Sequence, residues 1–194
     1  MIFVALLRGI NVGGNNKIAM KDLKVTFEQA GLARVVTYIN SGNVVFSDSG
    51  RSPADLAAHL EAAILNAHGF PVPVLIRRFA DFEILVRALP ESWHNDDRQK
   101  CDVLFLGDAI DAPGLVEKLD PKPDIDAVLY VPGAVIWSVD RDKVTRSGLL
   151  KLVGTKLYRQ MTIRNVNTVR KLYALMASQA DPTGKSAVNC PGCT

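Results

Sequence analysis

The chain has 194 residues, 48% of them apolar and 22% charged, which is the composition of a globular protein long enough to bury a core. A net charge of +3 is too small to require nucleic acid as a partner, and no apolar run approaches the length of a membrane span. Three cysteines, two of them among the last five residues, make no disulfide framework, so we expect a soluble protein in a reducing, cytoplasmic location.

The first half of the chain predicts elements in the order β-α-β-β-α-β. Residues 2–7 (IFVALL) are an apolar run of strand length and carry no basic leader, which favours a buried strand over a signal peptide. The segment SPADL predicts a helix start, because Ser52 suits the N-cap and Pro53 the first helical position. The predicted strands are 2–7, 35–39, 44–46 and 72–76, the last at a sheet edge because of Pro73, and the predicted helices are 20–30 and 53–68.

The second half predicts the same order again, although the two halves share little residue-level similarity. The fold class is therefore α+β, with two ferredoxin-like (β-α-β-β-α-β) subdomains in tandem and a C-terminal helix. We expect subdomains at 1–79 and 100–180, a helical linker at 80–99 and a flexible tail at 181–194. The predicted strands of the second half are 103–106, 127–131, 134–139 and 161–163, and the helices are 113–119, 147–157 and 166–178.

The ferredoxin-like topology brings two polar loops together. The exit of the first strand and the turn of the following hairpin lie at the same end of such a sheet. Residues 8–17 (RGINVGGNNK) and the turn at 40–43 (NSGN) should therefore meet. Both are rich in glycine and asparagine, and together they are the candidate site.

The first loop has the chemistry of an anion site but completes no known phosphate motif. Asn15 and Asn16 stand where a phosphate loop needs lysine and a hydroxyl, and the dinucleotide fingerprint G-x-G-x-x-G is absent. Glycines permit positive φ, so successive N–H groups can form an anion-binding nest. The alternative is a tight connector whose asparagines bond their own main chain. The candidate ligand-binding residues are Arg8, Asn11, Gly13, Gly14, Asn15, Lys17, Asn40, Ser41, Gly42 and Asn43.

Two further helix starts carry polar residues that could extend this site. Arg164 and Asn165 lie just ahead of the predicted last helix, and Arg146 lies ahead of the helix predicted from Ser147. The simpler interpretation is that Asn165, Asn167 or Thr168 caps the last helix and that Arg146 is a solvated arginine. Both interpretations are open.

The sequence offers no catalytic or metal constellation. Ser41 has no evident base, because the three histidines occupy a helix and a linker, so a Ser/His/Asp triad is not supported. The tail motif CPGC (190–193) is half a zinc site, but it sits in a polar segment that we expect to be disordered. We predict no metal and no cofactor.

The charges of the chain are segregated. Residues 91–126 carry ten acids and four bases, whereas residues 140–171 carry nine bases and two acids. Such a pattern is typical of a binding face, or of acidic and basic surfaces that match within the molecule.

Three segments resemble a known family. LLRGINVGGNNKIAM, TYINSGNVVF and RNVNTVRKL are similar to the signature segments of the bacterial domain of unknown function 1697 family, and the resemblance spans residues 2 to about 178. It implies an α+β fold with ferredoxin-like subdomains and no established activity, substrate or catalytic residues. It also implies that the glycine-rich loop and the turn form one functional surface.

The leading hypothesis is binding of a phosphate-bearing ligand, either a nucleotide, a phosphorylated small molecule or a nucleic-acid backbone, at residues 8–17 and 40–43. The alternatives are a small-substrate transferase or hydrolase at the same site and a protein-interaction module without a small ligand. No membrane partner is expected. The sequence leaves the oligomeric state and the question of catalysis open.

Overall fold

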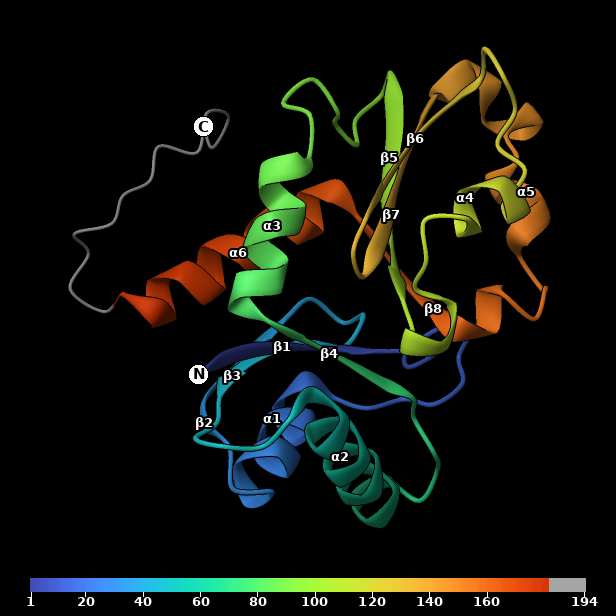
Figure 1. The fold of residues 1–194 in the computed structure, drawn as a ribbon. Helices are drawn as coiled ribbons and strands as arrows, with labels where there is room; N and C mark the ends of the chain where they lie inside the picture. Colours follow the sequence, from blue (N-terminus) through green and yellow to red (C-terminus); the bar gives the residue numbers. More distant parts are fainter. Residues whose placement is uncertain (182–194) are drawn as a thin grey trace. The chain divides into compact units, whose positions relative to one another are not determined.

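The structure, a computed structural model, describes residues 1–181 and contains two compact units (Figure 1). Among the described residues, the first unit comprises Met1–Phe82 together with residues 172–181, and the second comprises Glu83–Lys171. Each holds one four-stranded antiparallel sheet with its helices. The predicted α+β fold with two ferredoxin-like subdomains and a C-terminal helix is confirmed.

The first sheet has the strand order β2-β3-β1-β4. Its first strand lies in the middle, so both of its neighbours, β3 and β4, pair with it in antiparallel fashion. Figure 1 shows the two helices α1 (Met20–Gln29) and α2 (Pro53–His68) on one face of the sheet. The elements are β1 (Ile2–Leu7), α1 (Met20–Gln29), β2 (Ala33–Tyr38), β3 (Asn43–Ser47), α2 (Pro53–His68) and β4 (Val74–Arg78). The next helix, α3 (Phe79–Ala88), begins in this unit and continues into the second.

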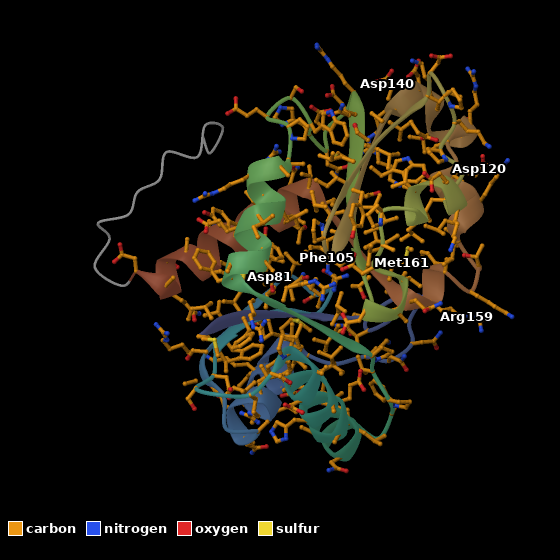
Figure 2. All side chains as sticks on the ribbon, in the orientation of Figure 1. Asp81, Phe105, Asp120, Asp140, Arg159 and Met161 are labelled. Atoms are coloured by element: carbon orange, nitrogen blue, oxygen red, sulfur yellow. The ribbon has the colours of Figure 1, made fainter. Side chains whose placement is uncertain are left out.

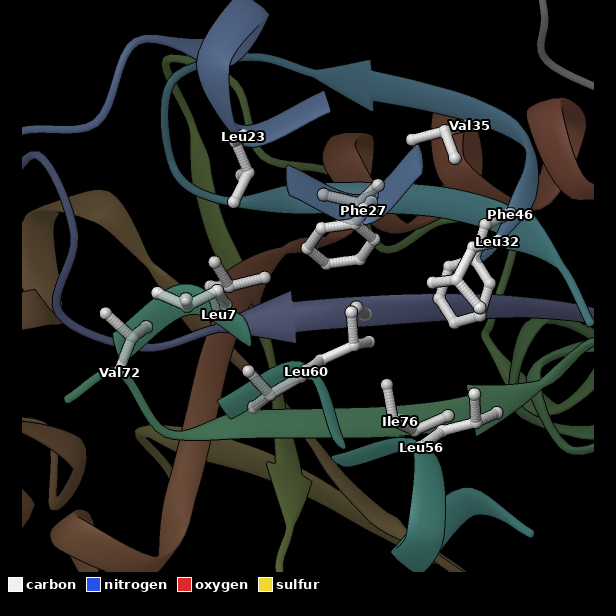
Figure 3. Packing of buried hydrophobic residues seen from close by; sticks show 14 of the residues in the cluster. Leu7, Leu23, Phe27, Leu32, Val35, Phe46, Leu56, Leu60, Val72 and Ile76 are labelled. Atoms are coloured by element: carbon white, nitrogen blue, oxygen red, sulfur yellow. The ribbon is translucent and has the colours of Figure 1, made fainter. Parts of the chain in front are cut away.

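The core of the first unit lies between this sheet and the helices α1 and α2 (Figure 3). Phe46 of β3 is at its centre, with the ring of Phe3 stacked at 5.7 Å between centroids and the ring of Phe27 edge-on at 5.8 Å. Leu23 and Leu60 extend the contact along the two helices and are fully buried. Apolar side chains of this size contribute about 1.5–3 kcal/mol each when buried, so this cluster fixes the sheet whose strand ends carry the candidate site.

The helix ends follow the local chemistry that the sequence predicts. The Ser52 hydroxyl accepts a hydrogen bond from the N–H of Asp55 at 3.1 Å, and Pro53 is the first residue of α2. Gly69 ends the same helix at φ 81° and Gly31 follows α1 at φ 84°, both in the left-handed region that glycine accepts without strain.

Both edges of the first sheet depart from regular strands. The pairing of β2 with β3 shifts register between Ala33 and Val36. The strand expected at 72–76 begins two residues later, at Val74, because Pro73 has no N–H to donate. The N–H of Val74 donates to the Glu61 carboxylate at 2.9 Å instead of to another strand.

The second sheet repeats the first, with the order β6-β7-β5-β8. Phe105 and Met161 are buried in this unit, whereas Asp120 and Arg159 lie at its surface (Figure 2). The strands are β5 (Gln99–Leu106), β6 (Asp126–Val131), β7 (Ala134–Asp140) and β8 (Met161–Asn165). The helices are α4 (Leu115–Lys118) and α5 (Leu149–Leu152), with 3₁₀ turns at Asp108–Ile110, Arg141–Arg146 and Tyr158–Gln160.

The helix expected over 147–157 is wrong. Only the four residues of α5 are helical, because Val153 leaves the helical region at ψ 129° and Gly154 takes φ 87°. Ser147 is buried and donates to Asp126 Oδ1 at 2.5 Å, while its hydroxyl accepts from the N–H of Leu149. The apolar spacing of this segment reflects the packing of Leu149, Leu152 and Leu157 in the core of the second unit, while Ser147 and Gly148 anchor the segment to Asp126.

The last helix, α6 (Val166–Ala180), forms as predicted and contributes to both units. Asn165 is its cap, since its Oδ1 accepts from the N–H of Thr168 at 2.8 Å. The residues of this helix from Leu172 to Ala180 belong to the first unit, where Tyr173 stacks on Phe79 at 5.6 Å between ring centroids. The division of the chain thus falls inside this helix rather than at its end.

Among residues 1–181 no helix is long and apolar enough to cross a membrane. The CPGC motif and nearly all of the predicted tail lie outside the described residues.

Candidate functional site

The glycine-rich loop and the hairpin turn meet at the exit of β1, as the topology predicts. The N–H of Leu7 donates to the Gly42 carbonyl at 2.8 Å, and Asn11 Nδ2 donates to the Asn40 carbonyl at 2.9 Å. Two segments distant in sequence are therefore joined by main-chain and side-chain hydrogen bonds at one end of the sheet.

Asn11 closes the base of the loop. Its Oδ1 accepts from the N–H of Ile18 and its Nδ2 donates to the carbonyl of the same residue, both at 2.9 Å. The side chains of Ile10 and Ile18 are buried on either side of the loop. With the bond to Asn40, both amide hydrogens of Asn11 are occupied, so this side chain positions the loop and has no N–H left for a ligand.

The tip of the loop is a miniature hairpin. The N–H of Asn15 donates to the carbonyl of Val12 at 3.1 Å, and Gly13 and Gly14 between them have φ 59° and 83°. Positive φ at both central residues is typical of a type I′ turn. The tip holds its shape through its own backbone, and its side chains are exposed.

The hairpin turn is equally constrained. Gly42 has φ 74°, and a Cβ at this position would lie 2.7 Å from Leu7 Cβ and 2.8 Å from Ile10 Cδ1. Asn43 is fully buried, and its Nδ2 donates to the Tyr38 carbonyl at 3.1 Å and to Ser41 Oγ at 2.9 Å. Gly42 and Asn43 therefore shape the turn.

A hollow of about 610 Å³ opens beside these segments. The loop hollow, as we call it, is lined by Asn11, Gly14, Lys17, Ile18, Ala19, Met20 and Asn40. Lys17 is exposed, and no carboxylate among residues 1–181 forms an ion pair with it. The hollow therefore carries an uncompensated positive charge.

The start of α1 also faces the loop hollow. Its N-cap is Ala19, which has no side-chain acceptor, so the first N–H groups of the helix lack the usual side-chain partner. These groups and the helix dipole favour an anion. Asp22 in the first turn acts in the opposite sense, since its carboxylate adds a negative charge near the same N–H groups.

A sequence profile described as "Protein of unknown function (DUF1697)" matches residues 1–137. The chain belongs to the DUF1697 family. Its structure is similar to that of the conserved bacterial protein SP0830 from Streptococcus pneumoniae, with a TM-score of 0.76 and 29% sequence identity, over 90% of this chain and 98% of that one. No curated protein matches the sequence. The family and the related structure establish the fold and leave the ligand open.

The remaining first-unit candidates in this DUF1697 chain differ in exposure. Arg8 and Ser41 are half-buried, and the N–H of Arg8 donates to the Pro73 carbonyl at 3.0 Å. Gly13 and Asn15 are exposed at the loop tip, and Asn40 is exposed in the turn and lines the loop hollow. The exposed polar groups thus lie on the loop tip, Lys17 and Asn40.

Three candidates belong to the second unit. Arg146 is exposed on the 3₁₀ turn after β7, and Asn165 caps α6. Arg164 lies within β8, where burial lowers the pKa of its guanidinium to about 10, so it keeps its charge at neutral pH. Its Nη1 donates to the Ile163 carbonyl at 2.9 Å.

The ion pairs of the acidic and basic stretches are local. Asp120 pairs with Lys122 and Asp140 with Lys143, each within its own stretch of the chain. Asp126, at the end of the acidic stretch, instead accepts from Gly148 in the basic one at 2.8 Å. Asp126 thus joins the acidic stretch to the basic one through a main-chain hydrogen bond and not through an ion pair.

This family member shows no catalytic constellation in residues 1–181. Burial raises the pKa of the Cys101 thiol to about 12, and the neighbouring Asp102 adds to the effect, so the thiolate is scarce at neutral pH. His59 contacts the Ala30 carbonyl and His68 the Thr26 hydroxyl, so both have structural partners. No cluster of His, Cys, Asp or Glu in these residues could hold a metal ion.

Sequence reasoning missed the part of the candidate site that α1 contributes. Ala19 and Met20 line the loop hollow, although neither side chain is polar. The sequence feature that could have revealed it is the start of the helix at Met20. Its N-cap position holds Ala19 instead of Ser, Thr, Asp or Asn, and it follows directly after a loop that contains Lys17.

Proposed function

We propose that this protein binds a phosphate-bearing ligand in the loop hollow. The main observation behind the proposal is that Lys17, Gly14 and the start of α1 line the same hollow. The start of α1 has no side-chain cap. A lysine and free helix N–H groups are complementary to a phosphate, and neither has a competing partner in the hollow apart from the charge of Asp22.

The dimensions of the loop hollow favour a nucleotide over a continuous nucleic-acid backbone. Its volume of about 610 Å³ lies within the range of small-molecule sites. Met20 supplies apolar surface in the hollow, and Val12 is 66% exposed beside Asn11 at the loop tip. A nucleobase or another flat group can lie against such surfaces while the phosphate meets Lys17.

Asn11 has a different role from the one its chemistry suggests. We assign it to positioning the loop, because both of its amide hydrogens are used by Ile18 and Asn40. Lys17 and the α1 N–H groups then bind the phosphate, and Asn15 and Asn40 offer polar groups at the rim.

The test is a titration of the whole protein at low salt with AMP, ribose 5-phosphate, inorganic phosphate and a short oligonucleotide, followed by calorimetry and thermal unfolding. A ligand at 100 times its Kd adds about 2.7 kcal/mol to the free energy of unfolding. Lys17→Gln should weaken binding about tenfold, as expected for the loss of one charge-assisted contact. Lys24→Gln is the matched control, since it removes the same charge from α1 outside the hollow.

The substitution Asp22→Asn should change the binding affinity in the opposite direction to Lys17→Gln. Removal of the negative charge from the first turn of α1 should tighten binding of the same ligand several-fold. Binding that responds equally to Lys17→Gln and Lys24→Gln, or that weakens in Asp22→Asn, contradicts the proposed site. A ligand that binds as proposed is then incubated with the protein to measure turnover, which separates a binding protein from an enzyme.

A further inference from the structure

A second hollow, of about 560 Å³, lies where β1 begins, at the end of that strand opposite to the loop hollow. The arginine hollow, as we call it, is lined among others by Ile2, Arg34, Arg78, Phe79 and Gln179, all of which belong to the first unit. The length of β1 separates the two hollows by about 17 Å, so one small ligand cannot occupy both.

The strand order of the first sheet brings the two arginines to this end. Arg34 is the second residue of β2, next to the pairing of Ala33 with Ser47. Arg78 is the last residue of β4, opposite Phe3 near the start of β1. Both arginines thus line one hollow at this end of the sheet.

The two guanidinium groups differ in how they are held. Arg34 Nη1 donates to the Gln179 carbonyl at 2.7 Å and its Nε donates to Ser47 Oγ at 3.3 Å, which leaves the other N–H groups available. The Arg78 side chain forms no ion pair and no hydrogen bond within residues 1–181. Neither arginine has a carboxylate partner in this part of the chain, so the positive charges of both residues that line the hollow are uncompensated there.

Gln179 adds a hydrogen-bond acceptor to the wall of the arginine hollow. Its Nε2 donates to the Arg34 carbonyl at 2.8 Å, which fixes the orientation of the amide. Its Oε1 is buried and has no hydrogen-bond partner in the described residues. A buried acceptor of this kind is satisfied in native proteins by a donor from water or from a ligand.

We propose that the arginine hollow binds a small organic oxyanion, a carboxylate or a phosphate monoester, that also carries a hydroxyl group. The oxyanion lies between Arg34 and Arg78, whose planar guanidinium groups are suited to pairs of oxygens. The carbon skeleton contacts Ile2 and Phe79, and the hydroxyl group donates to Gln179 Oε1. The site is independent of the loop hollow and of the function proposed for it.

The test is a titration of the ¹⁵N-labelled full chain at low salt, monitored by NMR. The probes are lactate and acetate in one arm and glycerol 3-phosphate and inorganic phosphate in the other. We expect saturable shifts of the Ala80 and Arg78 amides and of the Gln179 side-chain amide, with tighter binding of the hydroxylated member of each pair. Comparison of the two arms identifies carboxylate or phosphate as the preferred oxyanion.

Three variants test whether the probes bind in the arginine hollow. Arg78→Gln should weaken binding about tenfold without disturbing the fold, because its side chain has no partner to lose. Arg87→Gln, on the exposed side of α3, and Lys17→Gln, in the loop hollow, should leave binding unchanged. The proposal is overturned if no probe gives saturable shifts at Ala80 and Gln179, if Arg78→Gln behaves like Arg87→Gln, or if the hydroxyl group makes no difference.

Discussion

Asn11 and Gly42, which the sequence suggests as ligand-binding residues, fix the conformation of the loop and the turn. The Asn11 side chain bonds Ile18 and Asn40, and Gly42 packs against Leu7. Their arrangement holds the loop so that Lys17 is presented at a fixed place beside α1.

Gly42→Ala should lower the stability of the protein by more than the strain of placing alanine at a positive φ. The φ of 74° disfavours alanine, and the new Cβ would also lie 2.7 Å from Leu7 Cβ. Strain and overpacking together should lower the free energy of unfolding by roughly 2–4 kcal/mol, measured by urea denaturation. Gly13→Ala is the matched control, because Gly13 has φ 59° but nothing within 4 Å of its added Cβ, so we expect a loss of about 1 kcal/mol. Equal losses for the two variants would show that the contact with Leu7 is unimportant.

Asp48 should make stability depend on pH in acid. Burial raises the pKa of this carboxyl, but hydrogen bonds from the side chain and N–H of Arg51 and from the N–H of Gly50 outweigh it and lower the pKa to about 2. Because the folded pKa lies below the ordinary value of 3.8, the ionised form stabilises the fold, and this contribution is lost as the pH falls from 3.8 toward 2.

The contribution of Asp48 should be roughly 1–2 kcal/mol above this window. Asp48→Asn should therefore be less stable than the wild type at pH 7, and the two should converge near pH 2. Urea denaturation at a series of pH values measures this difference. A constant difference across the series would contradict the assigned role of the Asp48 charge.

At the scale of elements, the segment around α5 is held by one carboxylate. Asp126 accepts from Ser147, from the N–H groups of Lys122 and Gly148, and from Trp137 Nε1 at 2.9 Å. Burial raises the pKa of Asp126, but these hydrogen bonds outweigh it and keep the pKa below its usual value. A Cβ on Gly148 would lie 2.5 Å from the Asp120 carbonyl oxygen, so there is no room for a side chain at position 148.

Asp126→Ala should release the segment around α5 before the sheet. Loss of the carboxylate leaves the buried Ser147 hydroxyl and Trp137 N–H without an acceptor, which should cost roughly 3 kcal/mol or more. Hydrogen exchange should accelerate in 141–157 and change less in β5 and β7. Glu117→Ala, an exposed acid in α4, is the control and should change the exchange of neither region. Uniform acceleration across the second unit would contradict a local role.

The sequence predicted most elements because their signals are local. The apolar strand at 2–7, the cap at Ser52 and the asparagine before α6 each act within a few residues. The helix predicted at 147–157 does not form over its full length. Ser147 and Gly148 at its start donate hydrogen bonds to Asp126, which is distant in sequence and could not be identified from local patterns. The meeting of the loop and the turn could be predicted from topology, whereas the role of Asn11 depends on a carbonyl that only the folded chain brings near.

The arginine hollow could not be predicted in the same way. Arg34 and Arg78 are ordinary surface residues in sequence, and only the order β2-β3-β1-β4 places both at the end where β1 begins.

At the scale of the whole molecule, α6 divides its residues between the two units. Tyr173 and Gln179 contact Phe79 and Arg34 of the first unit, whereas Asn165 caps the helix within the second. Its two halves should therefore respond differently when one unit is weakened.

Phe27→Leu tests this division. The substitution loosens the core of the first unit by about 1–2 kcal/mol. Hydrogen exchange should then accelerate in 172–180 together with α1 and α2, and less in 161–171. Acceleration of equal size over the whole of α6 would contradict the division, and Ile84→Ala, at an exposed side chain of α3, serves as the control.

The two irregular edges of the first sheet also restrict how the protein can associate. The register shift in β2 disturbs the ladder on one side, and on the other the Glu61 carboxylate occupies the first N–H of β4, where it would repel the carbonyl oxygens of an arriving strand. Growth of the sheet by an added strand from a peptide or a second copy is thus disfavoured on both sides. The ligand sites proposed above lie instead at the ends of the strands, where the lysine and the two arginines are found.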